Sequence, residues 1–241
     1  MLEKVKGVVL YALRYGEDSL IVDIYTERYG TLPFLVKAQR QRRASVHTQL
    51  LRPLNILELE FDYRPSLSLQ RIRGMRLEVA YNTLPYEPVK QTLALFLSEL
   101  LHHALRHEAA NPPLLHFLQC SMQWLDKAKG NVGNFHIVFM LQLTRHLGLC
   151  PDVEAVEGTV HFDLQDGMVK PGIPQGGHCL SVRETALLPL FMRLSFPTMH
   201  LLRMTREQRA RALDLLILYF RLHVAEFPEL KSTEILRELM A

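Results

Sequence analysis

The spacing of apolar residues changes once along this chain of 241 residues, and that change most constrains its fold. Before about residue 78, apolar and polar residues alternate, with the period of a strand that has one buried face. Five such segments are expected between turn residues: Val5–Leu13, Leu20–Tyr25, Leu32–Val36, Leu57–Tyr63 and Leu67–Met75. Five short strands predict a small closed or nearly closed barrel, because closure removes exposed sheet edges. Pro33 has no N–H to donate, which favours an edge position for the third strand.

After residue 78 the apolar residues follow a helical period, as Leu93, Leu97 and Leu101 do. Thr205 and Gln208 form a capping-box pattern before a long helix. Residues 150–180 hold eight glycines and prolines, which predicts an irregular or short-stranded insert. We therefore expect an α+β chain with a barrel domain over residues 1–80 and an α-helical domain over residues 81–241. The expected helices run over Pro112–Trp124, Asn134–His146 and Ser181–Leu194, from Thr205, and from Ser232 or Thr233.

Composition excludes several classes of protein. With 48% hydrophobic and 22% charged residues the chain can bury a core, which excludes a disordered or fibrous protein. No apolar run reaches the roughly 18–20 residues of a membrane-spanning helix. The apolar run at Gly7–Leu13 meets Arg14 and no cleavage site, so no signal peptide is expected. Three cysteines without a CxxC pair indicate a reducing cytoplasm.

Positive charge gathers in the first third of the chain. Residues 1–80 hold 13 Lys and Arg against 9 Asp and Glu, whereas the rest holds 15 against 16. From Arg28 to Leu57 there is no Asp or Glu. Within that segment four cations fall in seven residues of an expected loop: Lys37, Arg40, Arg42 and Arg43. Such side chains can neutralise phosphates and release counterions, although a solvated loop that is basic by accident has the same composition.

Two further basic clusters are candidate nucleic-acid contacts. Arg71 and Arg73 share a parity on the last expected strand, so they should project from one face, with Arg76 nearby. Exposed aromatic residues beside them would complete a stacking and phosphate platform for single strands, although most aromatics of a small barrel fill its core. The second cluster lies around the start of the long helix, where cations oppose the helix dipole: Arg203, Arg206, Arg209 and Arg211. A solvated helical face would explain these arginines equally.

No catalytic motif is present, and the chain is expected to be no enzyme. His103 and His107 have the spacing of a zinc-binding helix, but Ala104 stands where the HExxH motif needs glutamate. Two cysteines and two histidines in or beside the insert match no standard zinc spacing: Cys150, His161, His178 and Cys179. The GxSxG, P-loop and GxGxxG motifs are all missing from the sequence.

Four blocks, in this order, carry a resemblance to a known family: GVVLYALRYGEDSLIVDIYTERYGTLPFLVKAQRQRR, LLRPLNILELEFDYR followed by LQRIR, FMLQLTRHLGLCPD, and LLILYFRLHVAEFPELKSTEIL. Over nearly its whole length the chain resembles the RecO family of recombination mediators. The resemblance implies an OB-fold barrel, binding of single- and double-stranded DNA, and annealing of complementary strands. It also implies RecR and the C-terminal tail of single-stranded DNA-binding protein as partners, help in loading RecA, and a place at the bacterial nucleoid in the cytoplasm.

One departure from the family concerns metal. Many RecO-like proteins carry two CxxC pairs that bind zinc in the insert. Here Val156 and Thr159 occupy positions near those where the first CxxC pair would fall. The segment after Gly176-Gly177, where the second pair would fall, has the single cysteine Cys179. The zinc site is therefore expected to be lost, and no cofactor is expected.

Three functions stay open at this point. The favoured one is a non-enzymatic mediator whose DNA-binding residues are Lys37, Arg40, Arg42, Arg43, Arg71 and Arg73, with Arg203, Arg206 and Arg209 as a secondary contact. The second is an adaptor whose basic barrel binds an acidic protein. The third is a zinc hydrolase built on the insert.

Overall fold

The computed structural model describes residues 2–37, 48–130, 132–154, 159–174 and 176–239. Their contacts divide the chain into two compact units. Unit 1 comprises Met1–Lys127 and Leu230–Leu239, and unit 2 comprises Ala128–Glu229 with the last two residues. The packing thus groups two helices and the C-terminal segment with the strands. The domain division at residue 80 stays a prediction.

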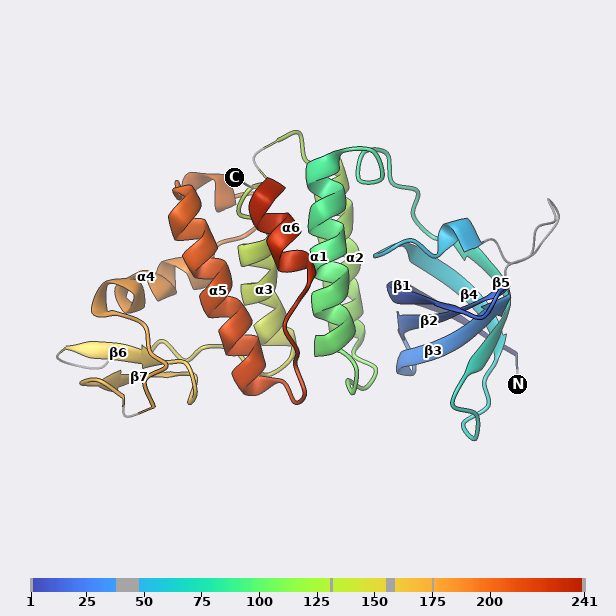
Figure 1. Cartoon of the computed structure of the whole chain (residues 1–241), viewed down its shortest axis with the longest axis horizontal. Helices are drawn as coiled ribbons and strands as arrows, with labels where there is room; N and C mark the ends of the chain where they lie inside the picture. The colour runs from blue at the N-terminus through green and yellow to red at the C-terminus, as the bar shows by residue number, and fades with distance from the viewer. Residues whose placement is uncertain (1, 38–47, 131, 155–158, 175, 240–241) are drawn as a thin grey trace. The chain divides into compact units, whose positions relative to one another are not determined.

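Unit 1 contains the expected five-stranded barrel (Figure 1). Its strands are β1 (Leu2–Tyr15), β2 (Ser19–Thr26), β3 (Gly30–Lys37), β4 (Ile56–Asp62) and β5 (Gln70–Leu77), and a short 3-10 helix, η1 (Thr48–Leu50), precedes β4. The barrel closes in the order β1-β2-β3-β5-β4. All neighbours are antiparallel except β3 and β5, which pair in parallel at Phe34 and Leu35.

The edge position expected for the third strand is wrong, because β3 has a neighbour on both sides. Its pairing with β5 covers only Phe34 and Leu35. Pro33 precedes that short contact, so its missing N–H removes no hydrogen bond from the pairing of β3 with β5. The barrel closes despite the proline.

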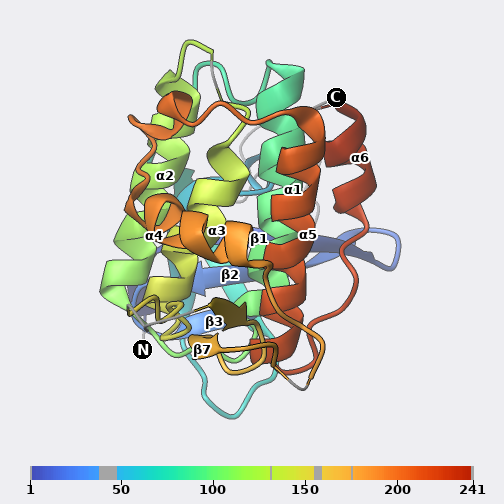
Figure 2. The same cartoon turned by 90° about the vertical axis from the view of Figure 1, so that its left-hand side faces the viewer.

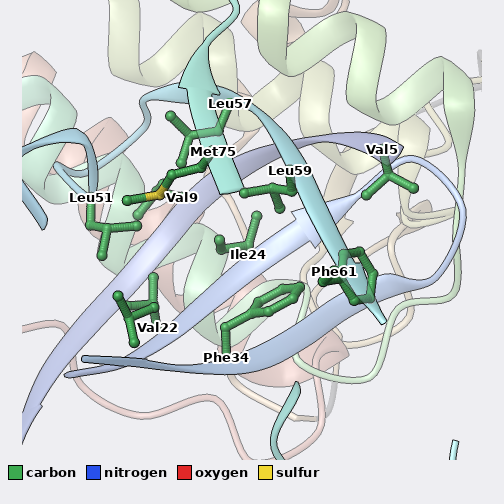
Figure 3. Packing of buried hydrophobic residues seen from close by; sticks show 11 residues of the cluster. Val5, Val9, Val22, Ile24, Phe34, Leu51, Leu57, Leu59, Phe61 and Met75 are labelled. Atoms are coloured by element: carbon green, nitrogen blue, oxygen red, sulfur yellow. The ribbon is translucent and has the colours of Figure 1, made fainter. Parts of the chain in front are cut away.

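The barrel interior is filled by the inward residues of the strands. Val22, Ile24 and Phe34 point into it, and Phe61 packs edge-on against Phe34 at 5.0 Å between ring centroids (Figure 3). All four side chains are fully buried. Since inward and outward residues alternate, this interior fixes which side chains each strand shows to the outside.

Three helices complete unit 1: α1 (Pro88–Ala104), α2 (Pro112–Lys127) and α6 (Ser232–Leu239). The leucine stripe of α1 is buried, and its Ser98 hydroxyl donates to the carbonyl of Leu10 in β1. Tyr25 of β2 donates to the carbonyl of Ala109, after α1, at 3.0 Å. The segment around α1 therefore covers one outer part of β1 and β2.

A buried carboxylate holds the segment between the barrel and α1. Asp126 of α2 is 4% exposed and accepts the backbone N–H groups of Asn82, Thr83 and Leu84 at 2.8–3.0 Å. Burial alone would raise the pKa of Asp126, but these donors lower it below its usual value. The carboxylate is therefore ionised at neutral pH, and it fixes the path of the chain into α1.

Unit 2 contains α3 (Phe135–His146), the hairpin β6 (Val160–Asp163) and β7 (Met168–Pro171), α4 (Val182–Arg193), the 3-10 helix η2 (Met199–Leu201) and α5 (Arg206–His223). The capping box expected at Thr205 is formed, and a second one joins Ser181 and Glu184 at the start of α4. Phe162, Leu164 and Tyr219 pack the hairpin against α5. The short-stranded alternative for the insert is thus the one observed. No helix in the described ranges is long and apolar enough to cross a membrane.

Candidate nucleic-acid interface

Three of the six predicted DNA-binding residues lie in the described part of the barrel. Lys37 ends β3, and Arg71 and Arg73 lie on β5. The other three, Arg40, Arg42 and Arg43, fall outside the described residues.

The register of the strands brings Lys37 and Arg71 to the same outer face. Leu35 pairs with Arg71, and Lys37 lies two residues farther along β3 on the same side. The intervening Val36 is 2% exposed and points inward, whereas both cations are exposed. Within the described ranges neither side chain has an ion-pair partner. These two positive charges are therefore available to an anion.

The same face continues onto β1 and β2 with apolar side chains. One row across the strands runs Leu13, Ile21, Leu35 and Arg71, and the next runs Tyr15, Ser19 and Lys37. Leu13 is 50% exposed and Tyr15 56% exposed. Figure 2 shows the β1–β2 turn, in blue, extending beyond the other strands of the barrel. We call the set Leu13, Tyr15, Ile21, Leu35, Lys37 and Arg71 the outer platform.

Arg73 projects outward as expected, but it already has a partner. It forms an ion pair with Asp62 of β4. The pairing of β4 with β5 shifts register around Arg73, because Glu60 pairs with Gly74 but Phe61 with Ile72. A bulge of this kind changes which residues face outward. As a result Arg76, of opposite parity, is exposed as well.

Arg76 and its neighbours form a charge-balanced face on β1, β4 and β5. Arg76 lies 2.8 Å from a Glu58 carboxylate oxygen, and Lys4 lies 2.9 Å from the same oxygen. Lys6 pairs with Glu78 in the same way. These contacts lower the pKa of Glu58, chiefly through the hydrogen bond from Arg76. Positive charge on this side of the barrel is matched by carboxylates, so the outer platform is the more electropositive face.

The arginines at the start of α5 do not form one patch. Arg209 donates to the side chain of Asn134 at 3.1 Å and to the carbonyl of Met204 at 3.4 Å, which holds it within unit 2. Arg211 pairs with Glu184 of α4 at 3.1 Å. Arg206 is exposed, and Arg203 borders a cavity.

That cavity lies within unit 2 and has a volume of about 430 Å³. Its walls are mostly apolar and come from α3, α4 and α5, with Leu141, Leu188 and Leu216 among them. Arg203 and Arg211 are its two cationic lining residues. Glu184 also lines the cavity and is the residue that pairs with Arg211, so Arg203 is the lining cation left to meet a ligand that is apolar and negatively charged.

The cysteines and histidines of the insert do not assemble a metal site. Among the described residues no group of three or more His, Cys, Asp or Glu could hold a metal ion. Cys150 is exposed, and the His161 ring is hydrogen-bonded to the carbonyl of Leu180 at 2.8 Å. A four-thiolate zinc site built from two CxxC pairs does not fit these residues, because the sequence contains no CxxC pair.

Asp163 organises the insert instead. Its carboxylate accepts from the Gln165 N–H at 2.9 Å and from the Lys170 ammonium at 2.9 Å. Burial alone would raise the pKa of Asp163, but these contacts lower it. The β6–β7 turn is thus held by a carboxylate and by the packing of Phe162.

Comparison with known proteins agrees with this architecture. The family described as "Recombination protein O N terminal" matches residues 1–81, and "Recombination protein O C terminal" matches residues 85–234. The chain belongs to the RecO family. It is 42% identical over 241 residues to the DNA repair protein RecO of Phocaeicola vulgatus, covering 100% of both chains. It is 41% identical to that of Bacteroides fragilis and 30% identical to that of Christiangramia forsetii, each over 240 residues and 99% of both chains.

Sequence reasoning about this RecO-family chain missed the apolar half of the outer platform. Tyr15 lies beyond the expected strand Val5–Leu13, because the turn residues Gly16, Glu17 and Asp18 follow it. A signal was present, since Tyr11, Leu13 and Tyr15 continue the alternation in the sequence, but the register shift between Val9 and Tyr11 turns these residues to the outside of the barrel. That continuation identifies a strand that extends past the barrel core.

Proposed function

We propose that this RecO-family protein is a non-enzymatic recombination mediator that binds single- and double-stranded DNA and anneals complementary strands. The observation that carries the proposal is the outer platform, where Lys37 and Arg71 are exposed without carboxylate partners among the described residues. OB-fold barrels bind oligonucleotides over the corresponding strands. Screening of phosphate charge by such residues lets two strands approach and pair.

The salt dependence of single-strand binding tests this proposal. Each lost phosphate contact should reduce the slope of log K against log salt by about 0.7. Lys37→Ala with Arg71→Ala should therefore reduce it by about 1.4, and removal of Arg40, Arg42 and Arg43 should reduce it further. Arg76→Ala is the matched control, because Arg76 is already paired with Glu58. An unchanged slope in the Lys37 and Arg71 double variant would remove the outer platform from the DNA surface.

The cavity of unit 2 is our proposed docking site for the tail of single-stranded DNA-binding protein. The tail of single-stranded DNA-binding protein that RecO-family members contact is apolar and acidic. Apolar side chains would fill the hollow between α4 and α5, and a tail carboxylate would bind Arg203 at its border. Leu187 and Leu190 of α4 are each 49% exposed and extend the apolar surface at this helix.

Binding of a labelled tail peptide to the full chain tests this docking site. Arg203→Ala is expected to weaken the complex about fivefold, which corresponds to about 1 kcal/mol. Arg193→Ala is the control, because Arg193 lies on α4 but does not line the cavity. Equal affinity of the two variants would place the tail elsewhere.

The remaining parts of the proposal follow from the family. The protein would pair with RecR, help to load RecA, act in the bacterial cytoplasm at the nucleoid, and need no cofactor. Strand annealing with and without single-stranded DNA-binding protein tests the mediator role directly. Retention of a plain oligonucleotide on a filter separates this role from the adaptor alternative, in which the barrel binds an acidic protein and leaves DNA free.

A further inference from the structure

The outer platform has two chemically different halves. Its cationic half lies on β3 and β5 and consists of Lys37 and Arg71. Its apolar half lies on β1 and β2, where Leu13 and Tyr15 are about half exposed and Ile21 is partly buried. A cationic surface that only binds phosphates needs no exposed leucine and tyrosine beside it. The exposed apolar half therefore indicates that a second, uncharged part of the ligand binds there.

We propose that the apolar half binds unpaired bases, with Tyr15 as the stacking residue, so that the platform prefers single strands to duplex. This inference rests on the proposed DNA-binding function and adds the part of the nucleic acid that is recognised. Bases stack on aromatic side chains without regard to sequence, because every base has a π-face. Tyr15 has no ring partner among the described residues, whereas Tyr11 already stacks on His102 at 4.5 Å.

The dimensions of the platform suit one nucleotide laid across the strands. Strands lie about 4.8 Å apart, so the two intervals from Lys37 on β3 to Tyr15 on β1 span about 10 Å. A phosphate bound by Lys37 would place the attached base toward Tyr15. Arg71 lies one strand farther and would bind a neighbouring phosphate of the same strand.

The charges of the β1–β2 turn fix the direction in which a nucleotide lies across the platform, from its phosphate to its base. Glu17 and Asp18 follow Tyr15 and are exposed at the turn. They repel a phosphate placed near the turn but leave uncharged bases unaffected. The sugar–phosphate chain is thus held toward β3 and β5, and the bases toward β1 and β2.

Duplex DNA gains much less from this arrangement. Its bases are already stacked inside the helix, and it presents phosphates to a surface of this kind. The cationic half therefore serves both forms of DNA, whereas the apolar half serves only unpaired bases. Loss of the Tyr15 ring should reduce single-strand affinity and leave duplex affinity unchanged.

Equilibrium binding of the full chain to a thymidine oligonucleotide and to a duplex of equal length tests the inference. Tyr15→Ala should weaken single-strand binding about tenfold, keep its salt slope, and leave duplex binding unchanged. Tyr15→Phe and Tyr15→Trp keep a ring and should restore affinity. Tyr86→Ala is the matched control, because Tyr86 is 75% exposed in unit 1 and lies outside the platform.

Other outcomes would overturn the inference. Equal loss on both DNA forms would make Tyr15 a general contact, and no loss on either would remove it from the site. Weaker binding of RecR with unchanged DNA binding would make the hairpin a protein contact. Failure of the proposed DNA-binding function would be distinguishable from failure of this inference. In that case the unmodified chain would bind neither the single strand nor the duplex.

Discussion

Replacement of Asp126 by asparagine should destabilise unit 1 with little change in shape. The Asp126 carboxylate accepts three consecutive backbone N–H groups, from Asn82 to Leu84. A hydrogen bond to a charged group contributes about 1.5–3 kcal/mol and a neutral one about 0.5–1.5 kcal/mol, so loss of the charge costs about 1 kcal/mol per bond. Three bonds give about 3 kcal/mol for Asp126→Asn. The side-chain N–H₂ of the introduced asparagine would also face a backbone N–H, and two donors cannot form a hydrogen bond.

Urea unfolding followed by the fluorescence of Trp124 measures this loss. Trp124 is the chain's one tryptophan and lies on α2, two residues before Asp126. Asp18→Asn is the control, because Asp18 is exposed in the β1–β2 turn. A difference between the two variants below about 1 kcal/mol would refute the role given to the carboxylate.

The pH dependence of unfolding gives a second, independent readout of the same group. The folded-state pKa of Asp126 is lowered, so its stabilisation is complete above the unfolded-state pKa. It is lost as the pH falls through the folded-state pKa. The unmodified chain should therefore lose stability on acidification more steeply than Asp126→Asn, and parallel curves would contradict the lowered pKa.

Three further predictions concern other elements. Glu99 accepts the N–H groups of Lys231 and Ser232 at 2.9 and 2.8 Å, so Glu99→Gln should speed amide exchange in α6 while exchange in β2 stays unchanged. Gly30 has a φ of 66°, and an added Cβ would lie 2.3 Å from the Glu108 carbonyl oxygen, so Gly30→Ala should cost more than about 2 kcal/mol in urea unfolding. A zinc chelator should leave the thermal unfolding temperature unchanged, whereas a fall of several degrees would show that the insert binds metal.

The strands and helices were largely predictable because their periods are local properties of the sequence. The start of β5 was not, since Leu67 was expected inside the strand. Gln70 is 3% exposed, and its side chain donates to the carbonyls of Arg64 and Leu67 at 2.9 Å, which holds the chain in a loop until Gln70. A single buried amide decides this boundary, and no periodicity reports it.

The candidate site was predictable only in its charges. Sequence spacing identified Lys37 and Arg71 as cations, but their common face depends on the parallel pairing of Leu35 with Arg71 across the barrel. The ion pair of Arg73 with Asp62 also depends on strand register. Contacts between distant segments are set by closure of the barrel, which local sequence does not encode.

The return of α6 to unit 1 has a consequence for biosynthesis. Glu99 and Ser232 are 133 residues apart, and the chain of unit 2 is made between them. At about 5–20 residues per second, the ribosome needs on the order of 10 s to pass from one to the other. During that interval Glu99 has not yet met the N–H groups it accepts in the finished protein. During synthesis, unit 1 therefore lacks its last helix, α6, until the chain of unit 2 has been made.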